Sequence, residues 1–518
     1  MAGPKQPFSV KIPPGVVRGA TPIDTPGTWY DSQLVRWTKG VMHPCAGWDR
    51  LAFTAVDPKI YTQVRAMHEW QDTQGRIWRA YLCDKQVYVE NEGAITDITP
   101  SGFVGPEGDF AAGGYGDDIY SYGTYGTPRP NQNRIRAVGP AFSINNWGQQ
   151  LVFMTSYDGR LHYWDPIAGG GAQPVAGAPT ANRLFVVTPS RHIVIFGLGG
   201  NYRRWGWCSQ EDYNDWDFNS DTNTAGFYDL EPASPIVAAS TVGSSIIFFT
   251  VAKAIVSNYI GVPYIFNYND LAEGVTPVSH QAIVEHGDQA SWLADNGFWN
   301  FDGSTLSDCQ STLFDFYNAD VNKQAARYRV SAVYLGMYNE VWWLYPNADV
   351  TENNRYISWD YSDKWWAKGS INRTCGLKAS YNSYPLMAKW LNVNDGSAIF
   401  RHEFGNIYSG ENLPFVESGS FNIMKGAVMC TLQQYVANDG VKEDTASVYY
   451  TFYGSFQRSG DPADSDFVYG PTVKNLDGYV DVDETARDWR IRLATGYQNA
   501  PPWTVGEMLF YAVQRGSR

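Results

Sequence analysis

The chain has 518 residues, a formal net charge of −14, 18% charged residues and 15% aromatic residues. Disordered chains are poor in aromatic residues and rich in charge, so this composition excludes disorder. It also disfavours a sequence-independent nucleic-acid clamp, because phosphate binding requires a surplus of Lys and Arg. With 50 Gly and 28 Pro, a mainly helical protein is not expected, since both residues weaken helix interiors.

Neither a secretory signal nor a membrane span is predicted. Residues 1–20 contain four prolines and no apolar run of the kind a signal peptide has. The most apolar long window, residues 234–256, contains Pro235, Gly243 and Lys253 and divides into two short strands around Gly243. The six cysteines are far apart and form no C-x-x-C pair, which predicts reduced core thiols in a protein folded in a cytoplasm.

Short strands joined by polar turns follow one another along most of the chain. Asp158-Gly159, Asn296-Gly297 and Asp395-Gly396 mark hairpin turns, because Gly accepts a positive φ. The predicted strand groups lie at residues 63–90, 150–164, 192–207, 245–259, 290–301, 331–367 and 384–404.

The clearest strand is the aromatic run at residues 340–346. Val341, Trp343 and Tyr345 share one face of such a strand, and Trp342 and Leu344 share the other. Because both faces are apolar, we expect this strand to be buried on both sides between neighbouring sheets.

The strand groups recur roughly every 45 residues, a spacing within the range of propeller blades. One blade does not bury both of its faces alone, so several must ring a common axis. The sequence therefore predicts an all-β protein with a β-propeller of about six or seven blades and a C-terminal β-sandwich domain. A pair of stacked β-sandwiches is the alternative fold.

Three regions follow from this pattern. Residues 1–59 form an N-terminal extended segment with ring-closing strands, residues 60–410 form the β-propeller, and residues 418–518 form the C-terminal β-sandwich after a linker at 411–417. The Gly- and Tyr-rich stretch 101–133 is predicted to be a long loop insertion in the propeller, of the kind that is usually functional. We interpret it as an inter-subunit arm.

One helix is predicted, over residues 318–329, with Asn318 or Asp320 as its N-cap. In the C-terminal region, strands are predicted at 421–424, 429–436, 447–455, 479–482, 489–495 and 503–514. Arg490 and Arg492 alternate there with Ile491 and Leu493, which predicts one wet face and one buried face.

No metal site is predicted. Asp217, Asn219, Asp221 and Asn223 alternate as in a calcium loop, but Thr222 stands where a Gly is required and Tyr228 where a bidentate Glu is required. A capped polar turn is the favoured interpretation of Asp217 to Asn223.

Two other groups of possible ligands are equally weak. His280 and His286 are six residues apart, which is not a metal-pair spacing. Asp461, Asp464 and Asp466 are interpreted as solvated turn carboxylates.

No catalytic residue and no cofactor site is predicted, because the chain lacks the phosphate-binding, zinc-protease and serine-hydrolase motifs. A carbohydrate-binding or glycoside-cleaving β-propeller protein remains the alternative, and a secreted adhesin is disfavoured by the missing signal. Carboxylates, Arg and Tyr near the axis would serve a propeller hydrolase; the available candidates are Arg203, Arg204, Asp212, Tyr213 and Asp215.

Several short phrases, in the same order along one chain, resemble the nozzle proteins of short-tailed bacteriophages, which are also called tail-hub or packaged-DNA stabilisation proteins. The resemblance covers residues 30–425 and is less specific in the C-terminal region. The phrases that carry it are Leu34-Val35-Arg36-Trp37, Gly47-Trp48, Asp97-Ile98-Thr99-Pro100, Trp205-Gly206-Trp207-Cys208-Ser209, Asp215-Trp216-Asp217, residues 340–346, residues 355–361 and Trp365.

The resemblance implies a structural virion protein and not an enzyme. Proteins of that family form a homo-hexameric tube below the head-to-tail adaptor ring, and tail fibre, spike or needle proteins join it. The tube retains packaged double-stranded DNA and conducts it through the lumen during ejection, without specific binding. The expected location is the virion tail, with assembly in the host cytoplasm, and we expect the lumen to carry net negative charge.

Overall fold

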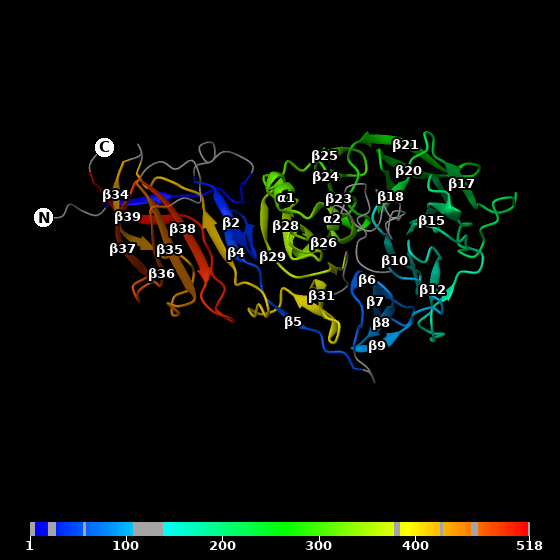
Figure 1. The fold of residues 1–518 in the computed structure, drawn as a ribbon, viewed down its shortest axis with the longest axis horizontal. Helices are drawn as coiled ribbons and strands as arrows, with labels where there is room; N and C mark the ends of the chain where they lie inside the picture. The colour runs from blue at the N-terminus through cyan, green and yellow to red at the C-terminus, as the bar shows by residue number, and fades with distance from the viewer. Residues whose placement is uncertain are drawn as a thin grey trace, which may run out of the picture.

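The computed structural model describes residues 6–18, 27–54, 59–106, 138–377, 384–424, 428–456 and 465–515. These residues form an elongated all-β molecule with many four-stranded antiparallel sheets (Figure 1). A multi-bladed β-propeller lies at one end of the long axis, and a pair of packed sheets lies at the other. Within the described ranges, no helix has the length and apolar character needed to cross a membrane.

In the described residues, seven sheets of four antiparallel strands make up the propeller, and we number them in chain order. Each of the first six takes four consecutive strands. They are sheet one, β6 (Val64–Gln71), β7 (Ile77–Cys83), β8 (Val87–Asn91) and β9 (Ala94–Asp97); sheet two, β10 (Phe142–Trp147), β11 (Gln150–Thr155), β12 (His162–Trp164) and β13 (Gln173–Pro174); sheet three, β14 (Leu184–Val187), β15 (Ile193–Phe196), β16 (Arg204–Trp207) and β17 (Gly226–Asp229); sheet four, β18 (Ile236–Val242), β19 (Ser245–Thr250), β20 (Lys253–Gly261) and β21 (Ile265–Glu273); sheet five, β22 (Ile283–His286), β23 (Gln289–Ala294), β24 (Gly297–Phe301) and β25 (Leu306–Asp308); and sheet six, β26 (Ser331–Leu335), β27 (Glu340–Tyr345), β28 (Arg355–Asp360) and β29 (Trp366–Ser370).

Sheet seven contains strands from two distant parts of the chain. It consists of β30 (Cys375–Gly376), β31 (Leu386–Asn392), β32 (Gly396–His402) and β5 (Trp48–Arg50). Strand β5 pairs with β32, with Trp48 opposite His402 and Arg50 opposite Phe400. The N-terminal segment thus completes the last sheet.

The first strands of the seven sheets form a closed ring. Each first strand contacts the first strands of the two adjacent sheets, and β30 contacts β6. The sheets therefore surround a common axis, and the prediction of an all-β, multi-bladed β-propeller is confirmed.

The aromatic run at residues 340–346 behaves as predicted. Every residue of β27 is buried. Val341, Trp343 and Tyr345 pack into one hydrophobic cluster, and Trp342 and Leu344 pack into another.

Two further sheets form what we call the two-sheet unit. The ring of Tyr435 lies 5.6 Å from that of Tyr450 and 5.8 Å from that of Phe452, so the two sheets pack face to face. One sheet has the order β1 (Gln6–Val10), β39 (Met508–Gln514), β34 (Cys430–Val436) and β37 (Tyr479–Ala486); the other has the order β2 (Trp29–Gln33), β33 (Phe415–Ser418), β38 (Asp488–Thr495), β35 (Val448–Ser455) and β36 (Phe467–Thr472).

The predicted region boundaries need correction. Strands β1 and β2 come from the segment 1–59, and β33 begins inside the predicted linker at 411–417. The unit is therefore not confined to residues 418–518, because its edge strands pair with partners that are far away in sequence. A hairpin of β3 (Val35–Thr38) and β4 (Val41–Pro44) follows β2.

Several C-terminal predictions were also wrong. Residues 421–424 are not a strand, and Phe421 makes only an isolated bridge to Trp489. Strand β39 begins at Met508 and not at residue 503, and β36 was missed.

Arg490 is not on a wet face. It is 5% exposed, lies 3.2 Å from Glu417 and stacks over Tyr453 at 4.4 Å. A carboxylate and an aromatic ring together make burial of this guanidinium tolerable.

The single predicted helix is two short helices, α1 (Phe314–Asp320) and α2 (Lys323–Arg329). The break occurs at Asn322, whose side-chain oxygen accepts a hydrogen bond at 3.1 Å from the amide of Ala325. Asn322, and neither Asn318 nor Asp320, is therefore the cap. The predicted loop 101–133 lies outside the described residues from position 107 onward.

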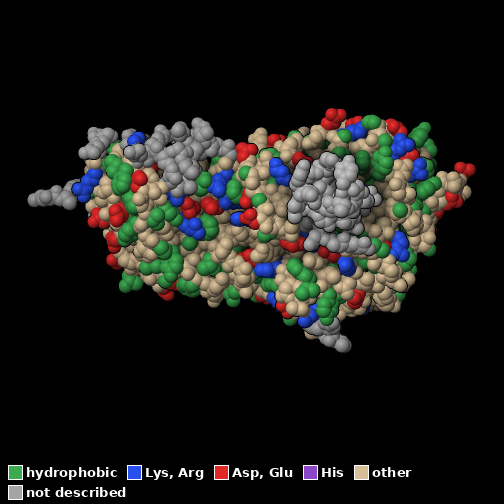
Figure 2. Space-filling model, in the orientation of Figure 1, with side chains coloured by type: hydrophobic (Ala, Val, Ile, Leu, Met, Phe, Trp, Pro, Cys, Tyr) green, Lys and Arg blue, Asp and Glu red, His purple; other side chains and the backbone are tan. Residues whose placement is uncertain are grey.

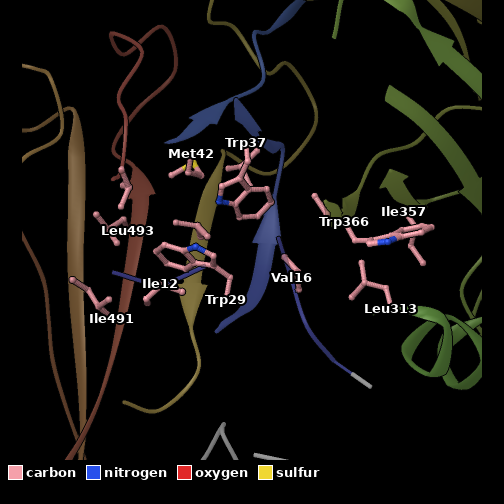
Figure 3. Close-up of a cluster of buried hydrophobic side chains, with 14 of the residues drawn as sticks. Ile12, Val16, Trp29, Trp37, Met42, Leu313, Ile357, Trp366, Ile491 and Leu493 are labelled. Atoms are coloured by element: carbon pink, nitrogen blue, oxygen red, sulfur yellow. The ribbon is translucent and has the colours of Figure 1, made fainter. Parts of the chain in front are cut away.

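A continuous hydrophobic core joins the propeller to the two-sheet unit (Figure 3). The N-terminal segment contributes Ile12, Val16, Trp29, Trp37 and Met42 to this core. On one side these residues meet propeller side chains that include Leu313, Ile357 and Trp366, and on the other side Ile491 and Leu493 of β38. The two parts share one core.

Hydrogen bonds strengthen this junction along the edge of sheet six. The side-chain amide of Gln33 on β2 makes two hydrogen bonds to the backbone of Ser370 on β29, as a peptide group of a neighbouring strand would. Its Nε2 donates to the carbonyl of Ser370 at 2.7 Å, and its Oε1 accepts from the N–H of Ser370 at 2.7 Å. Ser32 repeats the arrangement at Lys368, at 2.7 and 3.2 Å. The outer strand of sheet six is thus covered by β2.

Candidate functional site

The axis of the propeller contains a cavity of about 460 Å³. Residues from the first strands of all seven sheets line it, so the ring closure itself creates the cavity. Polar side chains face this space; they include Ser143, Asn145, Thr241, His280, Gln281 and Glu285. We call this space the axial cavity.

A short turn before sheet five crosses the axis. His280 and Gln281 begin the 3₁₀ turn η3 (His280–Ala282), and both are buried. The Nε2 atom of His280 lies 3.3 Å from the hydroxyl of Ser143, and the amide of Gln281 donates to the carbonyl of Phe142 at 2.7 Å. These bonds connect sheet five to sheet two across the centre, so side chains fill part of the axis.

The hydroxyl of Ser143 takes part in this cross-link. It also accepts a hydrogen bond at 3.4 Å from the amide of Phe185 on the adjacent sheet. The Ser143 residue is 4% exposed.

A buried ion network lies beside the cavity. Arg65 on β6 is paired with Asp84 at 3.0 Å and with Glu352 at 2.8 Å, and Glu352 is also 2.9 Å from Arg329. Burial alone would lower the pKa of Arg65, but the two carboxylates outweigh it and raise that pKa. Arg65 is therefore a permanently charged link between sheet one and the loop after β27.

Of the described residues that line the axial cavity, Glu285 is the one carboxylate. It accepts a hydrogen bond at 2.7 Å from the hydroxyl of Thr241. Glycoside hydrolysis ordinarily uses two carboxylates that flank the scissile bond. Within the described residues, the lining of this cavity supplies one carboxylate, that of Glu285.

The residues proposed from sequence for a propeller hydrolase do not meet at the axis. Arg203 lies in the turn before β16, Arg204 lies on β16, and the loop after β16 carries the other three, Asp212, Tyr213 and Asp215. None of the five lines the axial cavity. Arg204 is paired with Asp229 at 2.7 Å, and Arg203 is paired with Glu231. The ring of Tyr213 packs against Trp147 at 5.8 Å.

The segment from Asp217 to Asn223 forms a series of capped turns. The carboxylate of Asp217 accepts the amide of Asn219 at 3.0 Å. The side chain of Asn223 donates to the carboxylate of Asp215 and to the carbonyl of Asp217, each at 2.9 Å. Across the described part of the chain, no group of three His, Cys, Asp or Glu side chains is arranged to hold a metal ion.

Extensive EDTA treatment is therefore expected to leave the melting temperature unchanged. A metal bound only to the native state would stabilise it, and its removal would lower the melting temperature. Differential scanning fluorimetry with and without EDTA measures this. A drop of several degrees that added Ca²⁺ reverses, and that the variant Asp217→Asn does not show, would contradict the expectation.

His286, next to the cavity residue Glu285, is buried in its neutral form. Its Nε2 lies 2.7 Å from the hydroxyl of Ser291, which donates in turn to the side-chain oxygen of Asn300 at 2.7 Å. The Ser291 oxygen therefore accepts from His286. Burial, aided by the charge of Lys364, lowers the pKa of His286 to about 4.

Acid is expected to destabilise the fold through His286. An unfolded histidine binds a proton near pH 6.5, whereas the folded one does so only near pH 4. Stability contributed by the neutral form is therefore complete at pH 7 and falls by about 2–3 kcal/mol between pH 6.5 and pH 4.5. Urea unfolding of the wild type and of His286→Gln at both pH values measures this difference; parallel pH profiles would refute it.

All six cysteines are buried, as predicted, and none of them is joined to another in a disulfide. Burial raises the pKa of Cys208 to about 12 and that of Cys309 to about 12. Thiols of this kind are inert at neutral pH.

No protein-family model matches the chain, and no curated protein matches it. Among solved structures, a streptogramin B lyase is 10% identical, with 68% of this chain and 97% of that chain covered and a TM-score of 0.40. BamB from Moraxella catarrhalis is 10% identical, with 72% and 97% covered and a TM-score of 0.35. YCF48 from Cyanidioschyzon merolae is 8% identical, with 69% and 98% covered and a TM-score of 0.38. These are β-propeller proteins of diverse functions, so the similarity concerns the fold alone.

Proposed function

We propose that the chain is a seven-bladed β-propeller joined to a β-sandwich, the two-sheet unit, and that it is a structural protein of a short phage tail. In this proposal, copies of the chain, six by the family resemblance, form the distal channel, or nozzle, below the head-to-tail adaptor ring. The channel retains packaged DNA and conducts it during ejection. Tail fibre, spike or needle proteins attach to the same assembly.

The observation that carries the proposal is the shared hydrophobic core of the propeller and the two-sheet unit. Enzymes that close on a substrate need parts that move relative to one another. This junction instead fixes the two parts with buried tryptophans and paired side-chain bonds. A rigid two-part block suits a wall that must withstand the passage of DNA.

The narrow, partly filled propeller axis further supports a wall. His280 and Gln281 cross the axis, and the cavity measures about 460 Å³, which is the size of a small-molecule site. Duplex DNA must then run along an axis between copies of the chain. Each copy has a net charge of −14, and we propose that the wall of the lumen is negative as well. Such a wall would repel DNA weakly, and no contacts to phosphates would hold the DNA back.

Electron microscopy and DNA binding test this proposal. We expect the purified full chain, concentrated or mixed with its adaptor ring, to form rings with an open axis. Little affinity for duplex DNA is expected at about 150 mM salt, where the Debye length is about 8 Å. Submicromolar DNA binding that added salt weakens steeply would indicate a basic clamp, and a monomer that binds or cleaves glycans would favour the carbohydrate-active alternative.

A further inference from the structure

The hairpin of β20 and β21 carries the longest exposed apolar surface of sheet four. No charged residue occurs between Lys253 and Asp270, although the hairpin forms the outer half of the sheet. At its tip Val262 is 78% exposed, Tyr264 68% and Ile260 50%. Soluble surfaces normally place charge at such a tip, so this composition indicates a surface that is covered in the functional state.

The apolar surface extends beyond the tip. Tyr259 and Tyr268 of the same hairpin and Phe227 of β17 are each more than one-third exposed. Hydrophobic side chains are visible at the surface in this region, at the upper right (Figure 2). We call these six residues, Phe227, Tyr259, Ile260, Val262, Tyr264 and Tyr268, the hairpin patch.

The hairpin patch is held in shape by sheet three. The hydroxyl of Tyr228 on β17 donates to the carbonyls of Tyr264 at 3.3 Å and Phe266 at 3.2 Å. The His192 ring lies 5.5 Å from that of Tyr259 and 5.3 Å from that of Phe266. The patch is therefore a preformed face across two sheets, which lowers the ordering cost of binding a partner.

The size of the hairpin patch fits a protein interface. With roughly 200 Å² for a fully exposed aromatic side chain, its six residues present roughly 500 Å² of apolar surface. A standard interface buries about 800 Å² on each partner, a little more than half of it apolar. The patch can thus supply the apolar part of one complete side of a stable contact.

The charges at the rim favour a neutral, apolar partner. Lys253 lies 2.6 Å from Asp270, and Arg203 is paired with Glu231. Because these cations are already paired, they offer little to phosphates of nucleic acid or to anionic lipid headgroups.

Individual exposed apolar residues also occur in the two-sheet unit, at the other end of the molecule. Val468 on β36 is 56% exposed, Leu476 after it 91%, and Val513 on β39 43%. These strands lie at the end of the long axis opposite to β20 and β21 (Figure 1). Exposed apolar residues at both ends suit a head-to-tail contact, in which different parts of two copies meet and which closes into a ring when the rotation allows it.

We propose that the hairpin patch is the docking surface for a second copy of this chain, which approaches with its two-sheet unit. The inference rests on the ring assembly of the proposed function and assigns one side of its subunit contact. Val262 and Tyr264 lie at the centre of that contact.

The variant Val262→Glu tests the inference, with Val393→Glu as its control. Val393 is also 78% exposed, but it lies in the β31–β32 turn of sheet seven, beside Asn392 and Asp395. Sedimentation velocity and electron microscopy of the full chain measure assembly, and thermal unfolding verifies that each variant is folded. We expect Val262→Glu to weaken assembly at least about tenfold, as at interface hot spots, and Val393→Glu to assemble like the wild type.

The outcomes separate this inference from the proposed function. If Val262→Glu forms the same rings as the wild type, the hairpin patch is not the contact, although the nozzle proposal stands. If the wild type forms only a closed dimer that Val262→Glu dissociates, the patch does bind a second copy but the nozzle proposal fails. A wild type that stays monomeric at all concentrations, alone and with its adaptor ring, overturns both.

Discussion

Replacing Arg36 with methionine is expected to destabilise the protein by about 3–5 kcal/mol, because it leaves two buried carboxylates without a cation. Arg36 on β3 lies 3.0 Å from Glu340 on β27 and 2.7 Å from Glu403 after β32. The three side chains are 3–7% exposed. The ring of Tyr338 lies 3.5 Å from the guanidinium. This triad ties the N-terminal segment to sheets six and seven.

The instability of Arg36→Met should diminish in acid. Burial raises the pKa of Glu340 above its ordinary value even when Arg36 is present, and loss of the cation raises that pKa further. A group with a raised pKa in the folded state binds its proton there first, so the deficit of the variant shrinks as pH falls from 7 toward 5. Urea unfolding at several pH values measures this.

Two further variants make the Arg36 experiment decisive. Arg401→Met removes an ion pair with Asp49 in which the side chains are 32% and 41% exposed, and it should cost less than about 1 kcal/mol. The triple variant Arg36→Met, Glu340→Gln, Glu403→Gln removes the uncompensated charges and should recover most of the loss. A deficit in Arg36→Met that is small, or that does not depend on pH, would show that the triad contributes little.

Replacing Trp343 with alanine is expected to cost about 3–5 kcal/mol through the cavity that it leaves. Trp343 is fully buried, its ring lies 4.8 Å from Phe298, and its Nε1 donates to the carbonyl of Ala282 at 3.0 Å. Ala282 ends the turn η3 whose side chains cross the propeller axis. The substitution should therefore loosen the axis as well as the core.

Hydrogen exchange and unfolding midpoints measure this effect. In Trp343→Ala, faster exchange is expected at residues 280–282 as well as in β27. Trp343→Phe keeps most of the apolar volume and loses one hydrogen bond, so its cost should be about 1–2 kcal/mol. Equal costs for the two variants would mean that the hydrogen bond, and not packing, dominates at this position.

The sequence was informative where a strand is buried on both faces. Both faces of the strand predicted at residues 340–346 are apolar, so the sequence predicts burial of both. In the structure, the two faces pack into two separate hydrophobic clusters. Periodicity failed at Arg490, because a polar residue predicts exposure and its partners, Glu417 and Tyr453, are distant in sequence. The helix break at Asn322 was missed for a local reason: a capping side chain competes with helix continuation.

The axial cavity could not be derived from the sequence. Its lining takes one or a few residues from each of seven first strands, which are separated by whole sheets. A weak signal existed in Ser279, His280 and Gln281, a polar run just before the apolar start of β22. That run pointed to an unusual entry into the strand, but not to its partner Phe142 on sheet two.

Three N-terminal strands cannot pair until the ribosome has made their distant partners. Strand β5 pairs with β32, β1 with β39, and β2 with β33. About 350 residues separate β5 from β32, so at about 5–20 residues per second the ribosome takes roughly 20–70 s to deliver the partner. During that time the nascent ring has open edges, which are sites of aggregation. A chain released early can complete neither the ring nor the two-sheet unit.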